Sequence, residues 1–273
     1  MSISGADTNP GTSASPFRTI TKGLSVSASG DTVYVLPNAT AYSAGETFPL
    51  AVPAGVNLIG DEANRGSGAT PTAIIGCGNV VSLGNAAVTL AAGSTLGGFA
   101  VTCNAGGGMV VLQGNGATLR NSNLINGTSI YGAYVAGGTS NQTIVLNSFG
   151  GPTTPNFGGV RFLSPATSGK FENNTALNNS FGVVLDATPL SLGDNLTPVV
   201  SVGNNYLSCN SQADMYLAAT GIGGVNAQFN RWDHGPPTLL GTGFTSNTGI
   251  DLFYNGGGVT YGTANLVVPS PCP

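Results

Sequence analysis

Charged side chains are scarce in this sequence. Of its 273 residues only 7% are Asp, Glu, Lys or Arg, and the seven basic and eleven acidic residues give a net charge of −4. Nucleic acids and anionic membranes are recognised by clustered Lys and Arg, so we expect neither as a partner. Disorder is not expected either, because 41% of the chain is apolar and its net charge is small.

Long hydrophobic runs are also missing. No stretch approaches the roughly 18 consecutive apolar residues that suggest a transmembrane helix, so we expect no membrane-spanning segment. Met1 is followed by neither a basic nor an apolar leader segment. We interpret the chain as a mature domain that has lost its signal peptide, and we expect to find it outside the cell or in the cell envelope.

Histidine occurs once and cysteine four times, and no two cysteines have C-x-x-C spacing. We therefore expect no zinc site and no other cofactor. The cysteines are either reduced core residues or two disulfides, for which three connectivities exist. Of these we favour Cys77–Cys103, whose separation of 26 residues is about one repeat, together with Cys209–Cys272, which would hold the C-terminal tail.

Glycine and asparagine are abundant, and asparagine recurs at a regular spacing. The pattern apolar-x-Asn-x-x has copies spaced 26, 26, 31 and 26 residues apart, at Asn121, Asn147, Asn173, Asn204 and Asn230. A second series, in which Gly or Asp precedes an apolar run, follows each copy by about ten residues. Two series with one period predict coils of at least two short strands, which bury their apolar faces by stacking.

The predicted fold is therefore all-β, a single right-handed parallel β-helix. We expect the recurring asparagines to occupy one slot of successive coils. At a bend between strands, Asn tolerates the left-handed backbone conformation. Stacked side-chain amides also hydrogen-bond along the stack. These five asparagines are thus predicted to be structural.

A short amphipathic helix is predicted near the N-terminus as a lid over the first coil. Ser15 would be its N-cap and Pro16 its first residue. The face toward the first coil would carry Phe17, Ile20 and Leu24.

The repeat ends after Trp232, and Pro236 and Pro237 interrupt it. The tail then offers strands near 249–254 and 258–268. We therefore divide the single domain into an N-terminal cap (1–30), the coils (31–233), and a C-terminal cap with tail strands (234–273).

Several runs of the sequence resemble one known family. They include Ser15–Ile20, Gly30–Val35 and Gly55–Glu62 near the start, and Trp232–Pro237 near the end. They are similar to uncharacterised secreted bacterial proteins with a pectin-lyase-like parallel β-helix. The resemblance implies this fold and a secreted or envelope setting. It implies no activity, because the family has no known catalytic residues to carry over.

A glycoside hydrolase needs paired carboxylates about 5–9 Å apart. Equivalent positions of adjacent coils, about 4.8 Å apart, would provide such a pair. The strand acids are Glu172, Asp186, Asp214 and Asp251, and we expect none of them to pair in this way.

Two other polar groups have a functional and a structural interpretation. As a catalytic group, His234 would be a general base oriented by Asp233, with Arg231 holding an anionic sugar. We favour the alternative, in which these residues fasten the turn after the last coil. Asp7 and Asn9 begin like a calcium loop but lack its distal carboxylate, so we favour a turn that caps the N-terminal helix.

Three functions fit this sequence. The one we favour is a non-catalytic extracellular structural or adhesive β-solenoid, in an envelope or matrix or assembling with copies of itself. The second is a polysaccharide-binding module that uses aromatic side chains in loops, such as Phe157. The third is a polysaccharide lyase or glycoside hydrolase of the pectin-lyase-like fold.

Overall fold

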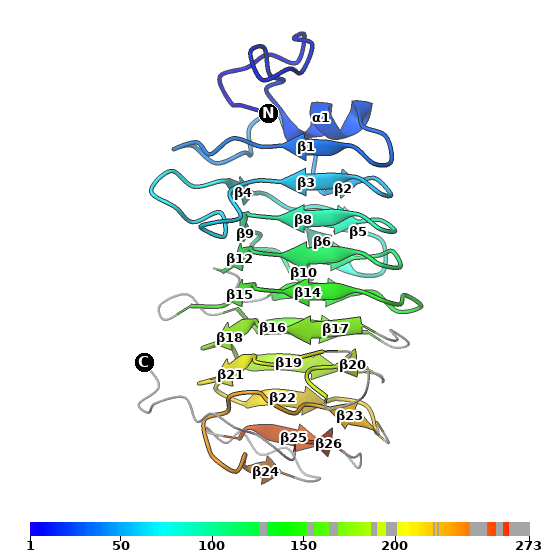
Figure 1. Ribbon diagram of the computed structural model, residues 1–273, viewed down its shortest axis with the longest axis vertical. Helices are drawn as coiled ribbons and strands as arrows, with labels where there is room; N and C mark the ends of the chain where they lie inside the picture. The colour runs from blue at the N-terminus through cyan, green and yellow to red at the C-terminus, as the bar shows by residue number, and fades with distance from the viewer. Residues whose placement is uncertain are drawn as a thin grey trace.

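The computed structural model describes residues 1–125, 130–151, 156–163, 169–186, 190–194, 201–220, 222, 224–240, 250–254 and 259–261. These residues form coils that lie one above another along the long axis, with helix α1 (Ile20–Val26) at one end and the last strands at the other (Figure 1). The strands of the three large sheets pair in parallel. The parallel β-helix predicted from the sequence is confirmed.

Three parallel sheets run along the stack. The first, in spatial order, contains β1 (Thr32–Tyr34), β3 (Asn57–Ile59), β8 (Thr95–Gly97), β11 (Thr118–Arg120), β14 (Thr143–Val145), β17 (Gly169–Glu172), β20 (Leu190–Ser191), β23 (Val225–Asn226) and β26 (Val259–Thr260). The second contains β2 (Leu50–Val52), β7 (Val88–Leu90), β10 (Gly108–Leu112), β13 (Tyr131–Val135), β16 (Gly158–Phe162), β19 (Phe181–Leu185), β22 (Ala213–Leu217), β25 (Leu252–Tyr254) and β24 (Leu239–Leu240). The third contains β21 (Tyr206–Ser208), β18 (Thr175–Leu177), β15 (Ser148–Phe149), β12 (Asn123–Leu124), β9 (Ala100–Thr102) and β4 (Ala73–Ile75). Outside them, β5 (Gly78–Val80) and β6 (Gly84–Ala86) form an antiparallel hairpin.

The core consists of columns of apolar side chains inside the coils. In the first sheet one column is formed by Leu58, Leu96, Leu119, Ile144 and Phe171, all fully buried. Neighbouring strands lie about 4.8 Å apart, so each side chain packs directly on its counterpart. Each such burial contributes about 1.5–3 kcal/mol.

A ladder of buried amides follows the turn between the first and third sheets. Its members are Ser122, Asn147, Asn174, Asn205 and Asn230, all fully buried. In each step a side-chain Oδ1 accepts the main-chain N–H of the residue one coil earlier, at 2.9–3.0 Å. The ladder thus gives hydrogen bonds to main-chain groups that would otherwise be buried without a partner.

The position just before each of these five ladder residues has a left-handed backbone. It is occupied by Asn121, Leu146, Asn173, Asn204 and Phe229, with φ between 45° and 61°. The single asparagine slot predicted from the sequence is therefore wrong. Asn147 and Asn230 belong to the buried ladder, whereas Asn121, Asn173 and Asn204 occupy the left-handed corner. Two adjacent backbone positions accept asparagine for different physical reasons, so the residue type alone cannot distinguish them.

Helix α1 begins later than predicted. Its N-cap is Thr19 rather than Ser15, because the Thr19 hydroxyl accepts the main-chain N–H of Lys22 at 3.1 Å. The Glu46 carboxylate accepts the N–H of Ile20 at 2.7 Å. Glu46 is distant in the sequence, which is why local helix signals placed the start too early. Ile20 and Leu24 are buried against the first coil as predicted.

The C-terminal end is closed by strands that break the coil order. Strand β24 pairs with β25 at the end of the second sheet, although it precedes β25 in the chain. Strands β25 and β26 fall within the predicted tail segments, whose remaining residues lie mostly outside the described ones. Trp232 is buried in the main core cluster, directly before the turn that contains Asp233 and His234.

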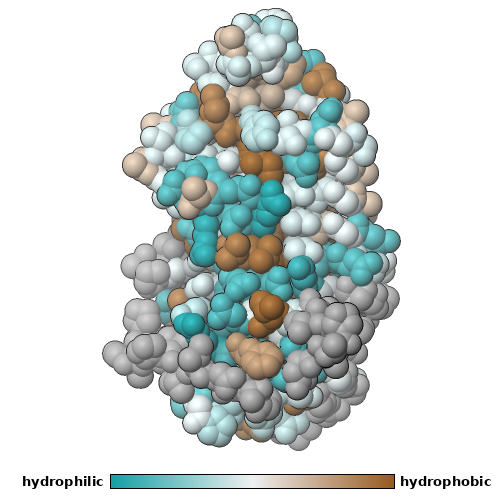
Figure 2. Space-filling model, viewed as in Figure 1, coloured by the Kyte–Doolittle hydropathy of each residue, from teal (hydrophilic) through white to brown (hydrophobic). Residues whose placement is uncertain are grey.

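The disulfide Cys77–Cys103 is confirmed, with the two Cα atoms 5.3 Å apart. Cys272, the expected partner of Cys209, lies outside the described residues. No helix in the described part of the chain has the length and hydrophobicity that crossing a membrane requires. The face of the molecule in Figure 2 carries hydrophilic side chains interrupted by separate hydrophobic patches, not by one continuous apolar stripe.

Candidate functional site

Two buried acids occupy the same slot of adjacent coils near the C-terminal end. Strands β22 and β25 pair Met215 with Leu252, so the preceding residues, Asp214 and Asp251, are neighbours across the sheet. The main-chain N–H of Met215 accordingly donates to the carbonyl of Asp251 at 2.8 Å. The expectation that no strand acids pair is therefore wrong. The pair was missed because 37 residues (251 − 214) separate its members, more than one period of the repeat.

The slot of Asp214 faces the inside of the stack. The register of β13, β16, β19 and β22 places Gly132, Gly159 and Gly182 in the same slot of earlier coils. A Cβ at Gly182 would lie 2.9 Å from the side-chain nitrogen of Asn210 and 2.4 Å from the carbonyl oxygen of Asp214. Glycine leaves this interior space to the asparagine side chains. Asp214 places its own carboxylate there instead, fully buried.

A second amide ladder leads to Asp214. The N–H of Asn156 donates to Asn179 Oδ1 at 3.2 Å, and the N–H of Asn179 donates to Asn210 Oδ1 at 3.0 Å. The side-chain amide of Asn210 then donates to Asp214 Oδ1 at 2.7 Å. The ladder therefore ends in a carboxylate. This second ladder was not predicted from the sequence, although its last spacing of 31 residues equals that between Asn173 and Asn204.

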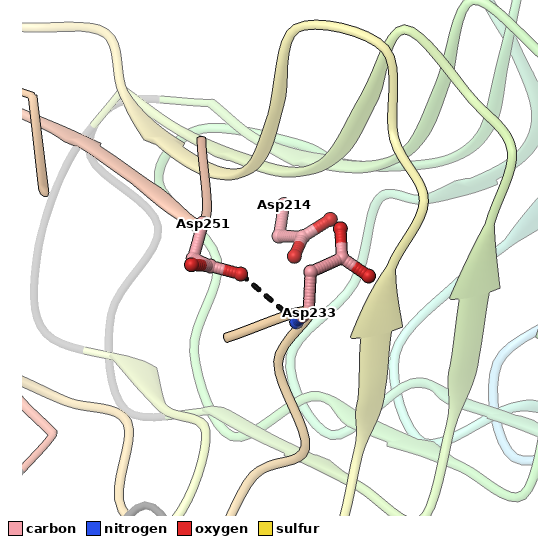
Figure 3. Close-up of side chains that lie close together, drawn as sticks. All are labelled: Asp214, Asp233 and Asp251. Carbon is pink, nitrogen blue, oxygen red and sulfur yellow. Dashed lines mark hydrogen bonds between the residues drawn. The ribbon is translucent and has the colours of Figure 1, made fainter. Parts of the chain in front are cut away.

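A third acid, Asp233, completes the cluster. Its carboxylate accepts the N–H of Cys209 at 2.9 Å, and its own N–H donates to Asp251 Oδ1 at 2.9 Å. One oxygen from each of the three carboxylates lies within 4.8 Å of the other two. Figure 3 shows the three side chains converging. Asp233 is only partly buried, so the cluster approaches the surface on its side.

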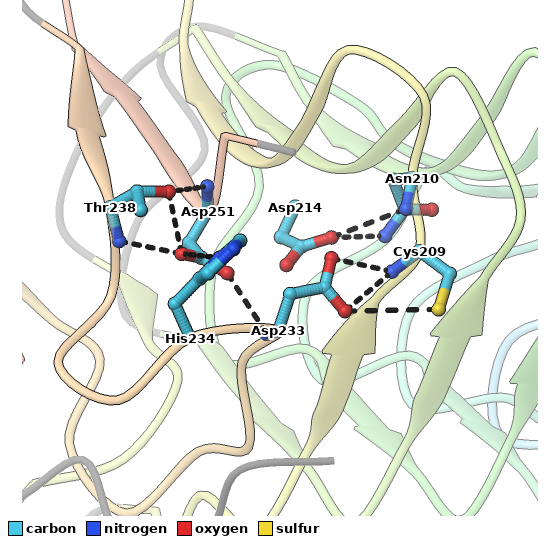
Figure 4. Close-up of polar contacts among 7 residues, drawn as sticks. All are labelled: Cys209, Asn210, Asp214, Asp233, His234, Thr238 and Asp251. Atoms are coloured by element: carbon cyan, nitrogen blue, oxygen red, sulfur yellow. Dashed lines mark hydrogen bonds and ion pairs between the residues drawn. The ribbon is translucent and has the colours of Figure 1, made fainter. Parts of the chain in front are cut away.

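The remaining contacts fasten Asp251 in place (Figure 4). Its Oδ2 lies 3.0 Å from His234 Nδ1 and accepts the Thr238 hydroxyl at 2.7 Å. The structure thus brings His234 and Asp233 into one network, but the histidine contacts Asp251. The Arg231 guanidinium lies over the ring of Tyr206, 4.0 Å from its centroid.

The electrostatics of the cluster follow from burial and from like charge. Burial raises the pKa of the Asp214 carboxyl well above its ordinary value, and the charges of Asp233 and Asp251 raise it further. Burial also raises the pKa of Asp233, against the hydrogen bond from Cys209. Three close carboxylates are stable together only with a bound proton or a cation between them. Among the described residues, this cluster is therefore the group best suited to hold a metal ion.

The other candidate for a cation, at Asp7 and Asn9, is engaged by the chain that leads into α1. Asp7 Oδ1 accepts the N–H groups of Arg18 and Thr19, both at 2.9 Å. The side-chain amide of Asn9 donates to the carbonyl of Pro16 at 2.9 Å. This geometry is that of a turn before the helix.

Comparison with known proteins places the chain in one family. No curated protein matches the sequence. A solved structure named rhamnogalacturonan lyase has a TM-score of 0.34 and 16% sequence identity, over 97% of this chain and 62% of that one. This chain thus spans less than two thirds of that protein. The family described as "Protein of unknown function (DUF1565)" matches residues 3–239, and the chain therefore belongs to this family.

Proposed function

We propose that the protein is a non-catalytic extracellular β-helix that serves as a rigid structural or adhesive element of an envelope or matrix. The observation that carries this proposal is that the paired strand acids point into the core and not toward the solvent. Asp214 and Asp251, the strand acids that face each other in adjacent coils, are fully buried, where a polymeric substrate cannot reach them. Asp251 instead fastens the turn that contains His234 and Thr238.

Two further observations support a rigid extracellular element. The disulfide Cys77–Cys103 links positions one coil apart, and disulfides persist mainly in oxidising surroundings such as the cell exterior. The buried ladder joins successive coils through their main chains. A stack held in this way has little freedom to bend or close around a small substrate.

Activity measurements test the absence of catalysis. The purified protein is incubated with pectin, alginate and related polymers, with and without calcium, and the release of reducing or unsaturated ends is measured. We expect no release. Release that disappears in the His234→Ala variant would overturn the proposal and favour the lyase or hydrolase alternative.

Sedimentation and electron microscopy test the assembling form of the proposal. A subunit of a matrix or envelope array is expected to associate as its concentration rises. A strict monomer at high concentration would contradict self-assembly and leave adhesion to another surface as the role to examine.

A second candidate function, polysaccharide binding, is favoured by aromatic rings on the outside of the second sheet. Successive ring pairs lie in contact, with centroids 5.4 Å apart for Tyr131–Phe157, 5.8 Å for Phe157–Phe181, 5.4 Å for Phe181–Tyr216 and 4.8 Å for Tyr216–Phe253. Phe157 is 40% exposed. Tyr131, Phe181 and Phe253 are buried, so they support Phe157 from below, and the exposed ring of Phe157 offers the apolar surface on which a sugar ring can stack.

Affinity electrophoresis in gels containing neutral or acidic polysaccharides tests this candidate. If the aromatic row binds glycans, the protein is retarded and Phe157→Ala reduces the retardation. Leu146→Ala is the matched control, because Leu146 is equally exposed at 40% but lies at the corner after the first sheet. Equal effects of both variants, or no retardation by any polymer, would exclude this function.

A further inference from the structure

We propose that Asp214, Asp233 and Asp251 bind one calcium ion, which ties the last coils of the stack together. The three acids come from β22, from the turn after Trp232, and from the residue before β25. The site is structural, so it goes beyond the proposed function and does not depend on it.

One carboxylate oxygen in the cluster lacks a partner. Asp214 Oδ1 accepts the side-chain amide of Asn210 at 2.7 Å, whereas Asp214 Oδ2 is buried and accepts no hydrogen bond from any of the described residues. Figure 4 shows this second oxygen on the side of Asp214 that faces Asp233 and Asp251. A buried carboxylate oxygen without a donor is strongly unfavourable. A cation placed between the three side chains would supply the missing interaction.

The surroundings hold the carboxylates in place without balancing their charge. Main-chain N–H groups of Cys209 and Asp233 donate to Asp233 and Asp251, respectively. His234 pairs with Asp251, and its side chain is 48% exposed. When all three carboxyl groups are ionised, the histidine carries at most one positive charge against three negative charges. A divalent cation inside the cluster balances the remainder, and in its absence the Asp214 carboxyl would hold a proton instead, because burial raises its pKa.

The donor set indicates which cation fits. All three donors are carboxylate oxygens, which suit calcium and magnesium better than zinc, whose sites are rich in Cys and His. The donor atoms here lie within 4.8 Å of one another, so one cation can reach all three. Calcium is favoured over magnesium because Ca²⁺ accepts several protein carboxylates in flexible geometry, whereas Mg²⁺ demands a regular octahedron and gives up its bound waters reluctantly. Water entering beside the partly buried Asp233 would complete the coordination.

Calcium in this position would act mainly on the C-terminal end of the stack. Asp214 lies in β22, and β25, which directly follows Asp251, pairs with β22 in the same sheet. Without the ion, repulsion between the carboxylates would loosen this pairing first. The earlier coils, joined by the amide ladder, would stay closed.

The experiment uses the full chain, freed of metal by dialysis against a chelator. Calcium binding is measured by isothermal titration calorimetry, and unfolding by scanning calorimetry with Ca²⁺, with Mg²⁺ and with chelator. We expect one Ca²⁺ per chain, a higher Tm in Ca²⁺ than in chelator, and a smaller rise in Mg²⁺. The fluorescence of Trp232, the single tryptophan and the residue before Asp233, should follow the same titration.

Two variants locate the site. Asp214→Asn keeps the shape of the side chain but removes its charge, and it should weaken Ca²⁺ binding by about 100-fold or more, in line with effects in metal sites generally. In chelator this variant should be at least as stable as the parent, since one repelling charge is gone. Asp186→Asn is the control, because Asp186 directly follows β19, the strand beside β22, and pairs with Arg161 at 2.9 Å. It should bind calcium as the parent does.

The outcomes separate this proposal from the proposed function. An identical Tm in Ca²⁺ and in chelator, with no bound ion, would overturn the calcium site while leaving a structural role intact. Unchanged binding by Asp214→Asn would place the ion elsewhere and overturn the site as well. Stronger stabilisation by Mg²⁺ would overturn the assignment to calcium. Polymer cleavage by the parent protein would instead refute the non-catalytic function.

Discussion

Replacing Asn174 by alanine tests how the coils are held together. The Asn174 side chain accepts the main-chain N–H of Asn147 at 3.0 Å and its side-chain amide at 3.1 Å. It also donates to the carbonyl of Ile144 at 2.9 Å and to Asn205 Oδ1 at 3.3 Å. In Asn174→Ala, the buried N–H of Asn147 loses its acceptor and the carbonyl of Ile144 loses an amide donor.

The expected loss of stability follows from these two groups. A buried polar group left without its hydrogen bond costs about 1–3 kcal/mol, so the variant should lose roughly 2–6 kcal/mol. The neighbouring Asn173→Gly is the control. Asn173 has a φ of 56° and accepts one exposed hydrogen bond, from Asn204 at 2.8 Å. Glycine adopts this φ readily, so the control should lose no more than about 1.5 kcal/mol.

The assay is equilibrium unfolding in guanidinium chloride, followed by circular dichroism. Hydrogen exchange is measured alongside it, because a stack of coils can open in part. Asn174→Ala should lower the midpoint clearly and speed exchange in the coils on either side of it. If Asn173→Gly were equally or more damaging, the assignment of the buried ladder to Asn174 would be refuted.

Three further predictions concern the disulfide, the N-terminal helix and the glycine slot. Cys77→Ser opens a disulfide loop of 26 residues and should lower the free energy of unfolding by about 3–4 kcal/mol. If reduction of the parent protein left its guanidinium midpoint unchanged, this prediction would be contradicted. Glu46→Ala removes the acceptor of the Ile20 N–H and should lower the free energy of unfolding by about 1 kcal/mol, as loss of a helix cap does. Hydrogen exchange should become faster in α1 alone, and unchanged exchange there would contradict the capping role. Gly182→Ala would bring a Cβ within 2.4 Å of the Asp214 carbonyl oxygen and should lower Tm through a strain of about 1–3 kcal/mol, whereas an unchanged Tm would mean that the two strands separate freely.

Part of the fold was predictable because the strands of successive coils in a β-helix recur at a regular spacing in the sequence. Two series with one spacing indicated stacked strands, and the spacing of Cys77 and Cys103 matched one coil. The burial of Ile20 and Leu24 followed from their helical spacing. These predictions depend on local patterns, which are preserved wherever coil length is constant.

The candidate site was less predictable. Asp233 and His234 stood out as a polar group in the sequence, but their common partner, Asp251, did not. It is separated from Asp214 by a coil of irregular length. Across a coil of irregular length, spacing along the chain no longer predicts which residues are neighbours, because strand register is set by backbone pairing and not by residue count.

The sequence by itself determined the architecture of this protein, because short apolar runs repeated at one period can bury themselves only by stacking. The tertiary structure alone decided which asparagine of each turn faces inward, since a shift of one residue moves a side chain from the ladder to the corner. It also decided that three acids from different coils meet. Their encounter depends on long-range register and on the glycines that keep the same interior slot open in earlier coils.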